Sequence, residues 1–165
     1  MTVEDLTHID AHGHARMVSV TEKAQTQRDA VARCTVSLSP AAIESLAQSQ
    51  ETDPLASARV TGIQAAKQTW DLIPLCHPLL IGDVVVEFVV GTDRIGIEAH
   101  VDTFGRTGVE MEALTACVAA ALAIYHSCRK LDPLAAITDL AVWEKRGGRS
   151  GSWRRRAETD EAASD

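Results

Sequence analysis

Hydrophobic and polar residues alternate between positions 30 and 38 of this chain. A period of two sends successive side chains to opposite faces of an extended backbone, so the stretch is predicted to be a strand with one buried face. Two later runs, 84–90 and 95–101, are rich in β-branched residues and flank a Gly-Thr-Asp turn, which predicts a hairpin. A last strand is predicted at 137–143. The buried face of the first strand would consist of Ala30, Ala32, Cys34, Val36 and Leu38.

Two helix starts carry the same signal, an N-cap acceptor followed by proline at the first helical position. The first is Ser39 with Pro40, and the second is Asp53 with Pro54, after a polar loop at 48–52. Proline cannot continue a helix, so Pro74 is predicted to end the second one. The inward positions are predicted to be Ile43 and Leu46 in the first helix and Leu55, Ala58, Ile63 and Ala66 in the second.

A third, longer helix is predicted over 112–130, after a polar, glycine-punctuated approach at 105–111. The resulting order is strand, helices, strand, strand, helix, strand. That order predicts an α+β ferredoxin-like sandwich, in which helices cover one face of an antiparallel sheet. The run VVVEFVV at 84–90 is apolar on both sides, so the open face of the sheet needs a cover, and oligomerisation is the simplest one.

Composition narrows the functional class. The 165 residues suit one domain, and 45% of them are hydrophobic, as in globular proteins. A formal charge of −7 argues against general nucleic-acid binding, which needs a basic surplus. The apolar run at 113–125 is shorter than the roughly 20 residues that a bilayer span needs, so no membrane partner is expected.

Cysteines and termini complete the outline. The four cysteines are widely spaced without a CxxC pair, and no signal peptide is recognisable, so a reducing cytoplasm is expected. Residues 1–16 are predicted to be flexible and 154–165 to form a disordered acidic tail. The histidines at positions 8, 12 and 14 match no closed zinc pattern, so they are interpreted as solvated and no metal site is expected.

Residues 72–79, LIPLCHPL, hold Cys76 and His77 between two prolines. This stiff connection suits a functional site. Adjacent side chains of an extended segment point to opposite faces, so His77 is interpreted as an acid/base or ligand group and Cys76 as buried, without mutual activation. The alternative is a core histidine with satisfied hydrogen bonds that stiffens the loop.

Both ends of the long helix carry candidate chemistry. Glu110 and Glu112 lie at its start, and which of the two faces a pocket depends on where the helix begins. The alternative is that both acids only stabilise the helix through its dipole. His126 and Arg129 share a face at the far end, where a cation also suits the dipole. At about 1.5 Å per residue, Glu112 and His126 are roughly 20 Å apart, too far for one small-molecule site within one subunit.

The segment 145–151 is a basic loop with three glycines. Its glycines let backbone amides approach an anion, while arginines such as Arg149 supply charge-assisted contacts to phosphate. A mobile tail is the alternative interpretation.

Taken together, these segments resemble the MoaC family, the cyclic pyranopterin monophosphate synthases of molybdenum cofactor biosynthesis. The similarity runs from about Thr7 to Trp153, and a single domain of this family is expected at 17–153. It is carried by MVSVTEK at 17–23, ARVTGIQAAKQT at 58–69, DLIPLCHPL at 71–79, RTGVEMEALTA at 106–116 and GGRSG at 147–151.

The resemblance implies a homohexamer, a trimer of dimers whose active sites lie at subunit interfaces. It also implies a nucleotide-derived substrate, 3′,8-cyclo-GTP, which a radical S-adenosylmethionine enzyme makes from GTP. This substrate would be rearranged to cyclic pyranopterin monophosphate with loss of pyrophosphate, and no metal or organic cofactor is implied.

Residue by residue, the family's substrate-binding positions fall on Leu75, Cys76, His77, Met111 and Glu112, with Glu110 beside them and Lys67 and Arg149 as further binding candidates. The catalytic positions differ: His126 stands where the family has an aspartate, and Arg129 and Glu51 stand where it has lysines. Arginine keeps its charge but does not readily give up a proton, whereas histidine moves protons near neutral pH.

Those three substitutions leave two alternatives to the synthase. One is a diverged paralogue that acts on another cyclised or phosphorylated nucleotide, with His77 and His126 transferring protons. The other is a non-catalytic hexamer that binds nucleotides or partners.

Overall fold

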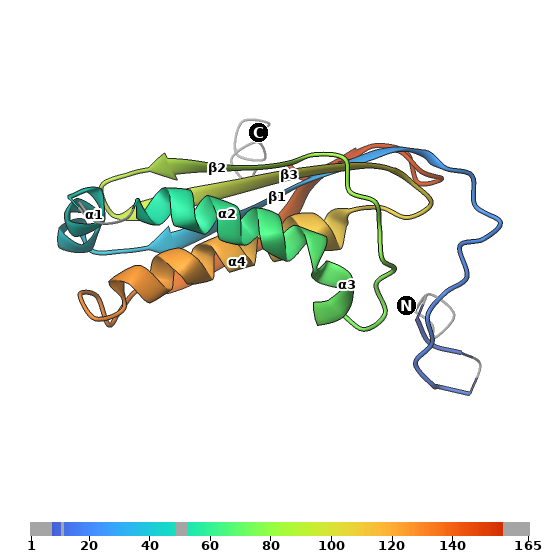
Figure 1. Cartoon of the computed structure of the whole chain (residues 1–165), viewed down its shortest axis with the longest axis horizontal. Coiled ribbons are helices and arrows are strands. Elements are labelled where there is room, and N and C mark those ends of the chain that lie inside the picture. The colour runs from blue at the N-terminus through green and yellow to red at the C-terminus, as the bar shows by residue number, and fades with distance from the viewer. Residues whose placement is uncertain (1–7, 11, 49–52, 157–165) are drawn as a thin grey trace, which may run out of the picture.

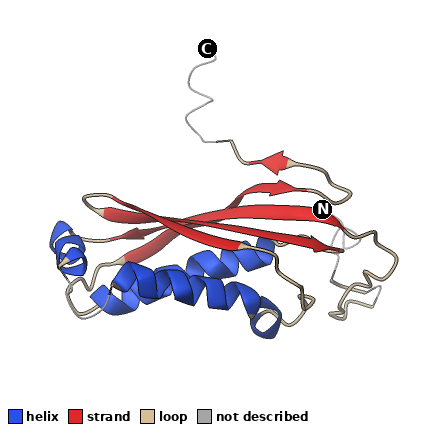
Figure 2. Ribbon diagram, turned by 45° about the horizontal axis from the view of Figure 1, so that its top comes forward, coloured by secondary structure: helices blue, strands red, loops and turns tan. Residues whose placement is uncertain are grey.

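A five-stranded antiparallel sheet forms one layer of the molecule, and helices cover only one of its faces (Figure 2). The computed structural model describes residues 8–10, 12–48 and 53–156. The strand order is β2-β3-β1-β4-β5, as the α+β prediction requires for its first four strands. The strands are β1 (Thr26–Ser37), β2 (Val84–Val90), β3 (Arg94–Gly105), β4 (Ala136–Arg146) and β5 (Trp153–Arg154).

The central strand β1 confirms the alternation read from the sequence. The predicted residues within the strand are between 0% and 3% exposed, Leu38 just beyond it is 5% exposed, and the Cys34 thiol donates to the Cys117 carbonyl of the helix layer. The strand begins at Thr26, four residues earlier than predicted, because Thr26 to Asp29 pair with the last residues of β3. These residues carry no apolar alternation, so only the partner strand reveals them.

Both predicted helix starts are confirmed in α1 (Pro40–Ala47) and α2 (Pro54–Lys67). The Ser39 hydroxyl accepts a hydrogen bond from the Ala42 N–H, and the Asp53 carboxylate accepts from Leu55 and Ala56. The predicted end at Pro74 is wrong, because α2 ends at Lys67 and a short α3 (Thr69–Leu72) follows. The Thr69 hydroxyl donates to the carbonyls of Ala65 and Ala66, which closes the last turn of α2.

The long helix α4 (Glu110–Cys128) runs along the sheet beside α2 (Figure 1). It begins and ends two residues earlier than predicted, with Arg129 as its C-cap. Its length and composition would allow a membrane span, yet it packs in the core against β1, β3 and β4. Small side chains permit this close packing; the buried ones include Ala113, Ala116, Cys117, Ala120, Ala121 and Cys128.

The outer face of the sheet carries apolar side chains that nothing described here covers. Val89 of the edge strand β2 is 75% exposed, and Phe104 of β3 is 64% exposed. The predicted β2–β3 hairpin is confirmed, whereas β5 was not predicted, since its two residues carry no periodicity. Trp153 and Arg154 pair with the end of β4 and thereby position the glycine-rich loop between them.

Candidate active site

Six of the predicted site residues line one cavity of about 220 Å³. We call it the Cys-His cavity. Three segments that are distant in the sequence form it: the N-terminal segment with Val18, Val20 and Lys23, the loop after α3, and the first turn of α4 with the residues before it. The six predicted residues are Leu75, Cys76, His77, Glu110, Met111 and Glu112.

A turn places Cys76 and His77 in this cavity. The Cys76 N–H donates to the carbonyl of Ile73 at 2.9 Å, so the segment is a β-turn rather than the extended connection predicted from its prolines. Both side chains therefore line the cavity, and Cys76 is partly rather than fully buried, contrary to the prediction. Burial and the nearby charge of Glu112 raise the pKa of the Cys76 thiol, so it is not an activated nucleophile.

Glu112 is the most constrained group of the cavity. The helix begins at Glu110, which turns Glu112 toward the protein interior, where it is only 4% exposed. Burial, together with the charge of Glu110, raises the pKa of Glu112 to about 7. A carboxyl group with such a pKa can gain or lose a proton at physiological pH, as acid/base chemistry requires.

Glu110 has a different environment, since it has a partner. The ammonium group of Lys145, near the end of β4, lies 3.4 Å from its carboxylate and also donates to the Ser150 hydroxyl at 2.9 Å. Sequence reasoning placed Lys145 only in the basic loop and missed this role. Lys145 lies on β4, which pairs with β1, and this position could have indicated its role. The register of the two strands, however, could not be predicted from the sequence.

A larger hollow of about 920 Å³ adjoins the first, and Lys23 lines both. We call it the basic cavity; it is lined by Ser19, Glu22, Lys23, Ala24, Thr26, Arg28, Gly148, Arg149 and Ser150. Gly147 and Gly148 have positive φ angles of 88° and 71°, and a β-carbon at position 147 would lie 2.2 Å from the Gln27 carbonyl oxygen. The loop thus needs glycine to place Arg149 beside Lys23 and Arg28.

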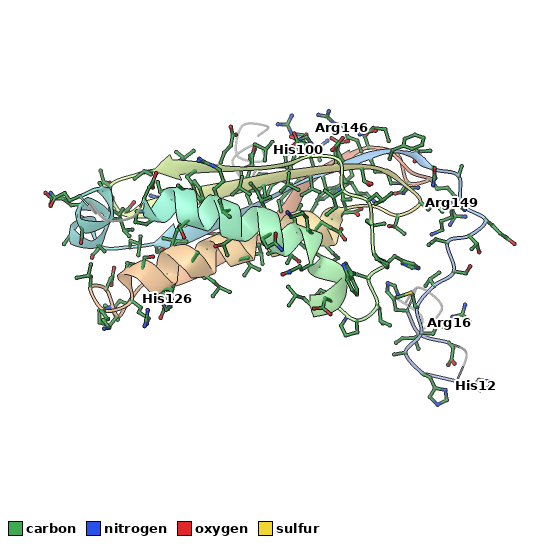
Figure 3. The ribbon with its side chains drawn as sticks, viewed as in Figure 1. His12, Arg16, His100, His126, Arg146 and Arg149 are labelled. Atoms are coloured by element: carbon green, nitrogen blue, oxygen red, sulfur yellow. The ribbon has the colours of Figure 1, made fainter. Side chains whose placement is uncertain are left out.

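The remaining predicted residues lie elsewhere. His126 and Arg129 are exposed at the far end of α4, and Figure 3 shows His126 and Arg149 at opposite ends of the molecule. The Arg129 guanidinium donates to the His126 carbonyl at 2.6 Å. Lys67 is exposed in the last turn of α2 and lines neither cavity. Glu51 lies outside the described residues.

No three His, Cys, Asp or Glu side chains in the described part of the chain form a group suited to a metal ion. His12 and His14 are exposed near Asp10, whose carboxylate accepts hydrogen bonds from their backbone N–H groups. In the same segment, Ile9 and Ala15 form an isolated antiparallel β-bridge.

Comparison with known proteins identifies the family of this chain. The model of the MoaC family matches residues 17–148, which include both cavities apart from His8, Arg149 and Ser150. The cyclic pyranopterin monophosphate synthase of Thermomicrobium roseum is 49% identical over 162 residues, which are 96% of this chain and 96% of that protein. The chain therefore belongs to the MoaC family.

Proposed function

We propose that this protein is a cyclic pyranopterin monophosphate synthase of molybdenum cofactor biosynthesis. It would convert 3′,8-cyclo-GTP, supplied by a radical S-adenosylmethionine enzyme in the cytoplasm, to cyclic pyranopterin monophosphate and pyrophosphate. The observation that carries the proposal is the convergence of Cys76, His77 and Glu112 in one cavity of a chain 49% identical to such a synthase.

The two cavities suit the two parts of this substrate. A volume of about 220 Å³ is below the usual range for a drug-sized ligand, so the Cys-His cavity accommodates the fused ring system but not the phosphates. The adjoining basic cavity offers Lys23, Arg28 and Arg149 to the phosphates. In this arrangement the reacting ring lies beside the acid/base groups and the leaving pyrophosphate lies beside the cations.

A second copy of the chain would complete the site. His126 and Arg129 are separated from Glu112 by most of the 19 residues of α4, so they belong to the cavity of another subunit. Exposed apolar side chains flank both regions, as an interface requires. Near the cavity they are Trp70, Leu72 and Met111, and near the far end of α4 they are Leu122, Leu131 and Leu134.

We propose the family's homohexamer, a trimer of dimers, as the assembly that brings these surfaces together. Within it, Arg129 would hold negative charge on the leaving phosphates, because its guanidinium stays protonated. His126 would transfer a proton near neutral pH, a task that Arg129 is poorly suited to perform. The functional unit would be the single domain at 17–153.

The test is direct. Purified protein is given 3′,8-cyclo-GTP, and pyrophosphate release is followed together with the pterin product. Formation of both at a matched rate supports the synthase. Tight binding without turnover contradicts it, and a different product from another cyclised nucleotide favours a paralogue.

A further inference from the structure

The segment 17–24 lies in no helix or strand, yet it lines both cavities (blue in Figure 1). Such a segment has no ladder of backbone hydrogen bonds to place it, so individual contacts must fix its position. Lys23 is the residue of this segment that lines both the Cys-His cavity and the basic cavity. The group that holds the segment therefore determines where this cation lies.

Arg106 makes the contact that ties the segment to the rest of the protein. Its Nη1 group donates to the Val20 carbonyl at 3.5 Å and also to the Thr21 carbonyl. Within the described ranges, no other hydrogen bond joins 17–24 to a residue outside it. Arg106 is half-buried, follows directly on β3 and lines neither cavity, so its contact with the segment is its visible role.

One carbonyl group connects Arg106 with Lys23. The Lys23 N–H donates to the Val20 carbonyl at 3.1 Å and closes a turn, in which the Ser19 and Thr21 hydroxyls are 2.8 Å apart. A carbonyl oxygen has two lone pairs, so it accepts from Lys23 and Arg106 together. We infer that Arg106 is a positioning residue, which holds this turn and thereby keeps Lys23 at the junction of the two cavities.

The end of β3 supports a second cation of the basic cavity as well. The Gly105 carbonyl accepts a hydrogen bond from the Nε group of Arg28 at 3.0 Å. Thr107 and Gly108, on the other side of Arg106, line the Cys-His cavity. Arg106 thus lies in a short stretch of chain whose neighbours contact both cavities, and a loss of its hydrogen bonds should be felt in ligand binding.

The inference rests on the proposed function only in taking Lys23 as a contact for phosphate. Arg106 also carries a charge of its own, which attracts an anion over a longer range. The two effects differ in one respect, because an effect through the turn requires Lys23, whereas the charge of Arg106 acts without it. A double-mutant cycle separates them.

The cycle uses the full-length protein with inorganic pyrophosphate as the probe and calorimetry as the measurement. Arg106→Met should weaken pyrophosphate binding about tenfold, because the charge-assisted hydrogen bonds to the turn are lost. Arg106→Lys, which keeps a donor and the charge, should recover part of this loss. In a Lys23→Met background, Arg106→Met should have less than about a twofold further effect.

Hydrogen exchange followed by mass spectrometry reports on the segment itself. In Arg106→Met the amides of 17–24 should exchange several-fold faster, whereas those of α4 should be unchanged, which also establishes that the variant is folded. Arg59→Met is the matched control, because the Arg59 guanidinium donates to the Val86 carbonyl at 2.9 Å and lines neither cavity. It should change neither pyrophosphate binding nor the exchange of 17–24.

The outcomes separate this inference from the proposed function. Unchanged exchange at 17–24 in Arg106→Met, or a loss of affinity that persists in the Lys23→Met background, overturns the positioning role and leaves the synthase standing. The expected cycle without turnover of 3′,8-cyclo-GTP contradicts the synthase and supports the role of Arg106. A parent protein that does not bind pyrophosphate contradicts the phosphate role of the basic cavity, and the exchange of 17–24 then decides whether Arg106 holds the turn.

Discussion

The ammonium group of Lys145 lies 3.4 Å from the carboxylate of Glu110, and this ion pair joins β4 to the first turn of α4. It separates the electrostatic roles of two glutamates that are only two positions apart. Glu110 is half-buried and balanced by a cation, whereas Glu112 is buried and has no such partner. One glutamate thus orders the rim of the cavity, and the other remains free to exchange a proton.

Lys145→Met should raise the pKa of Glu112 further, because an unbalanced Glu110 charge repels the ionised form. In a ¹³C NMR titration of the ligand-free protein, the midpoint of the Glu112 carboxyl group would move to higher pH. Arg146→Met is the matched control, since Arg146 pairs with Asp29 and Glu144 instead. An identical shift in both variants would show that a general loss of positive charge, and not this ion pair, is responsible.

Glu112 should also make the folded protein less stable as the pH rises. The folded state binds the proton of Glu112 more tightly than the unfolded state, because the folded pKa of about 7 exceeds the unfolded value of 4.5. The contribution of Glu112 to the free energy of unfolding is therefore most favourable below pH 4.5 and is lost as the pH rises through 7. Glu112→Gln removes this loss, and its stability relative to the parent should increase by about 3 kcal/mol between pH 4.5 and pH 8. Urea unfolding at both pH values measures the difference. A difference in stability that is the same at both pH values would contradict the raised pKa of Glu112.

The sequence predicted the features whose physical cause is local. The alternation from Ala30 to Leu38, and the caps at Ser39 and Asp53, need only neighbouring residues, and the structure confirms them. The juxtaposition of Cys76 with Glu112 required the family resemblance, because the two segments are distant in the sequence and meet through the packing of α2 and α3 on α4. Lys145 was missed because an ion pair across β4 and α4 depends on register, which no local pattern encodes.

Gly62 fixes the approach of α2 to α4. A β-carbon at this position would lie 2.8 Å from the carbonyl oxygen of Ala116 and 3.3 Å from the β-carbon of Ala120. Gly62→Ala would gain about 1 kcal/mol of helix propensity, yet the backbone contact forces the helices apart, so a net loss of about 1–3 kcal/mol is expected. Thr61→Ala, exposed on the same helix, should change the unfolding free energy by less than about 1 kcal/mol. Equal effects in the two variants would contradict close packing at Gly62.

Asp132 joins the segment after α4 to the start of α1. Its carboxylate accepts hydrogen bonds from the backbone N–H groups of Ser39 and Leu134, at 2.5 and 3.1 Å, and the Ser39 N–H lowers its pKa. A lowered folded pKa contributes stability above the unfolded value, and this contribution is lost as the pH falls through the folded value. Asp132→Asn should therefore unfold at a lower temperature than the parent at pH 7, with the two melting temperatures converging at low pH. A constant difference across the pH range would indicate a packing effect instead.

Sharing of sites between subunits predicts complementation. His77→Ala removes a group of the Cys-His cavity, and Arg129→Ala removes one from the far end of α4, so each variant alone should be nearly inactive. If every site takes the cavity from one subunit and Arg129 from its dimer partner, half of the dimers in an equal, randomly assorted mixture contain both variants, and each has one site without a substitution. The mixture should therefore recover roughly a quarter of the parent activity. A mixture that assembles into hexamers but stays inactive would contradict this sharing of sites between subunits.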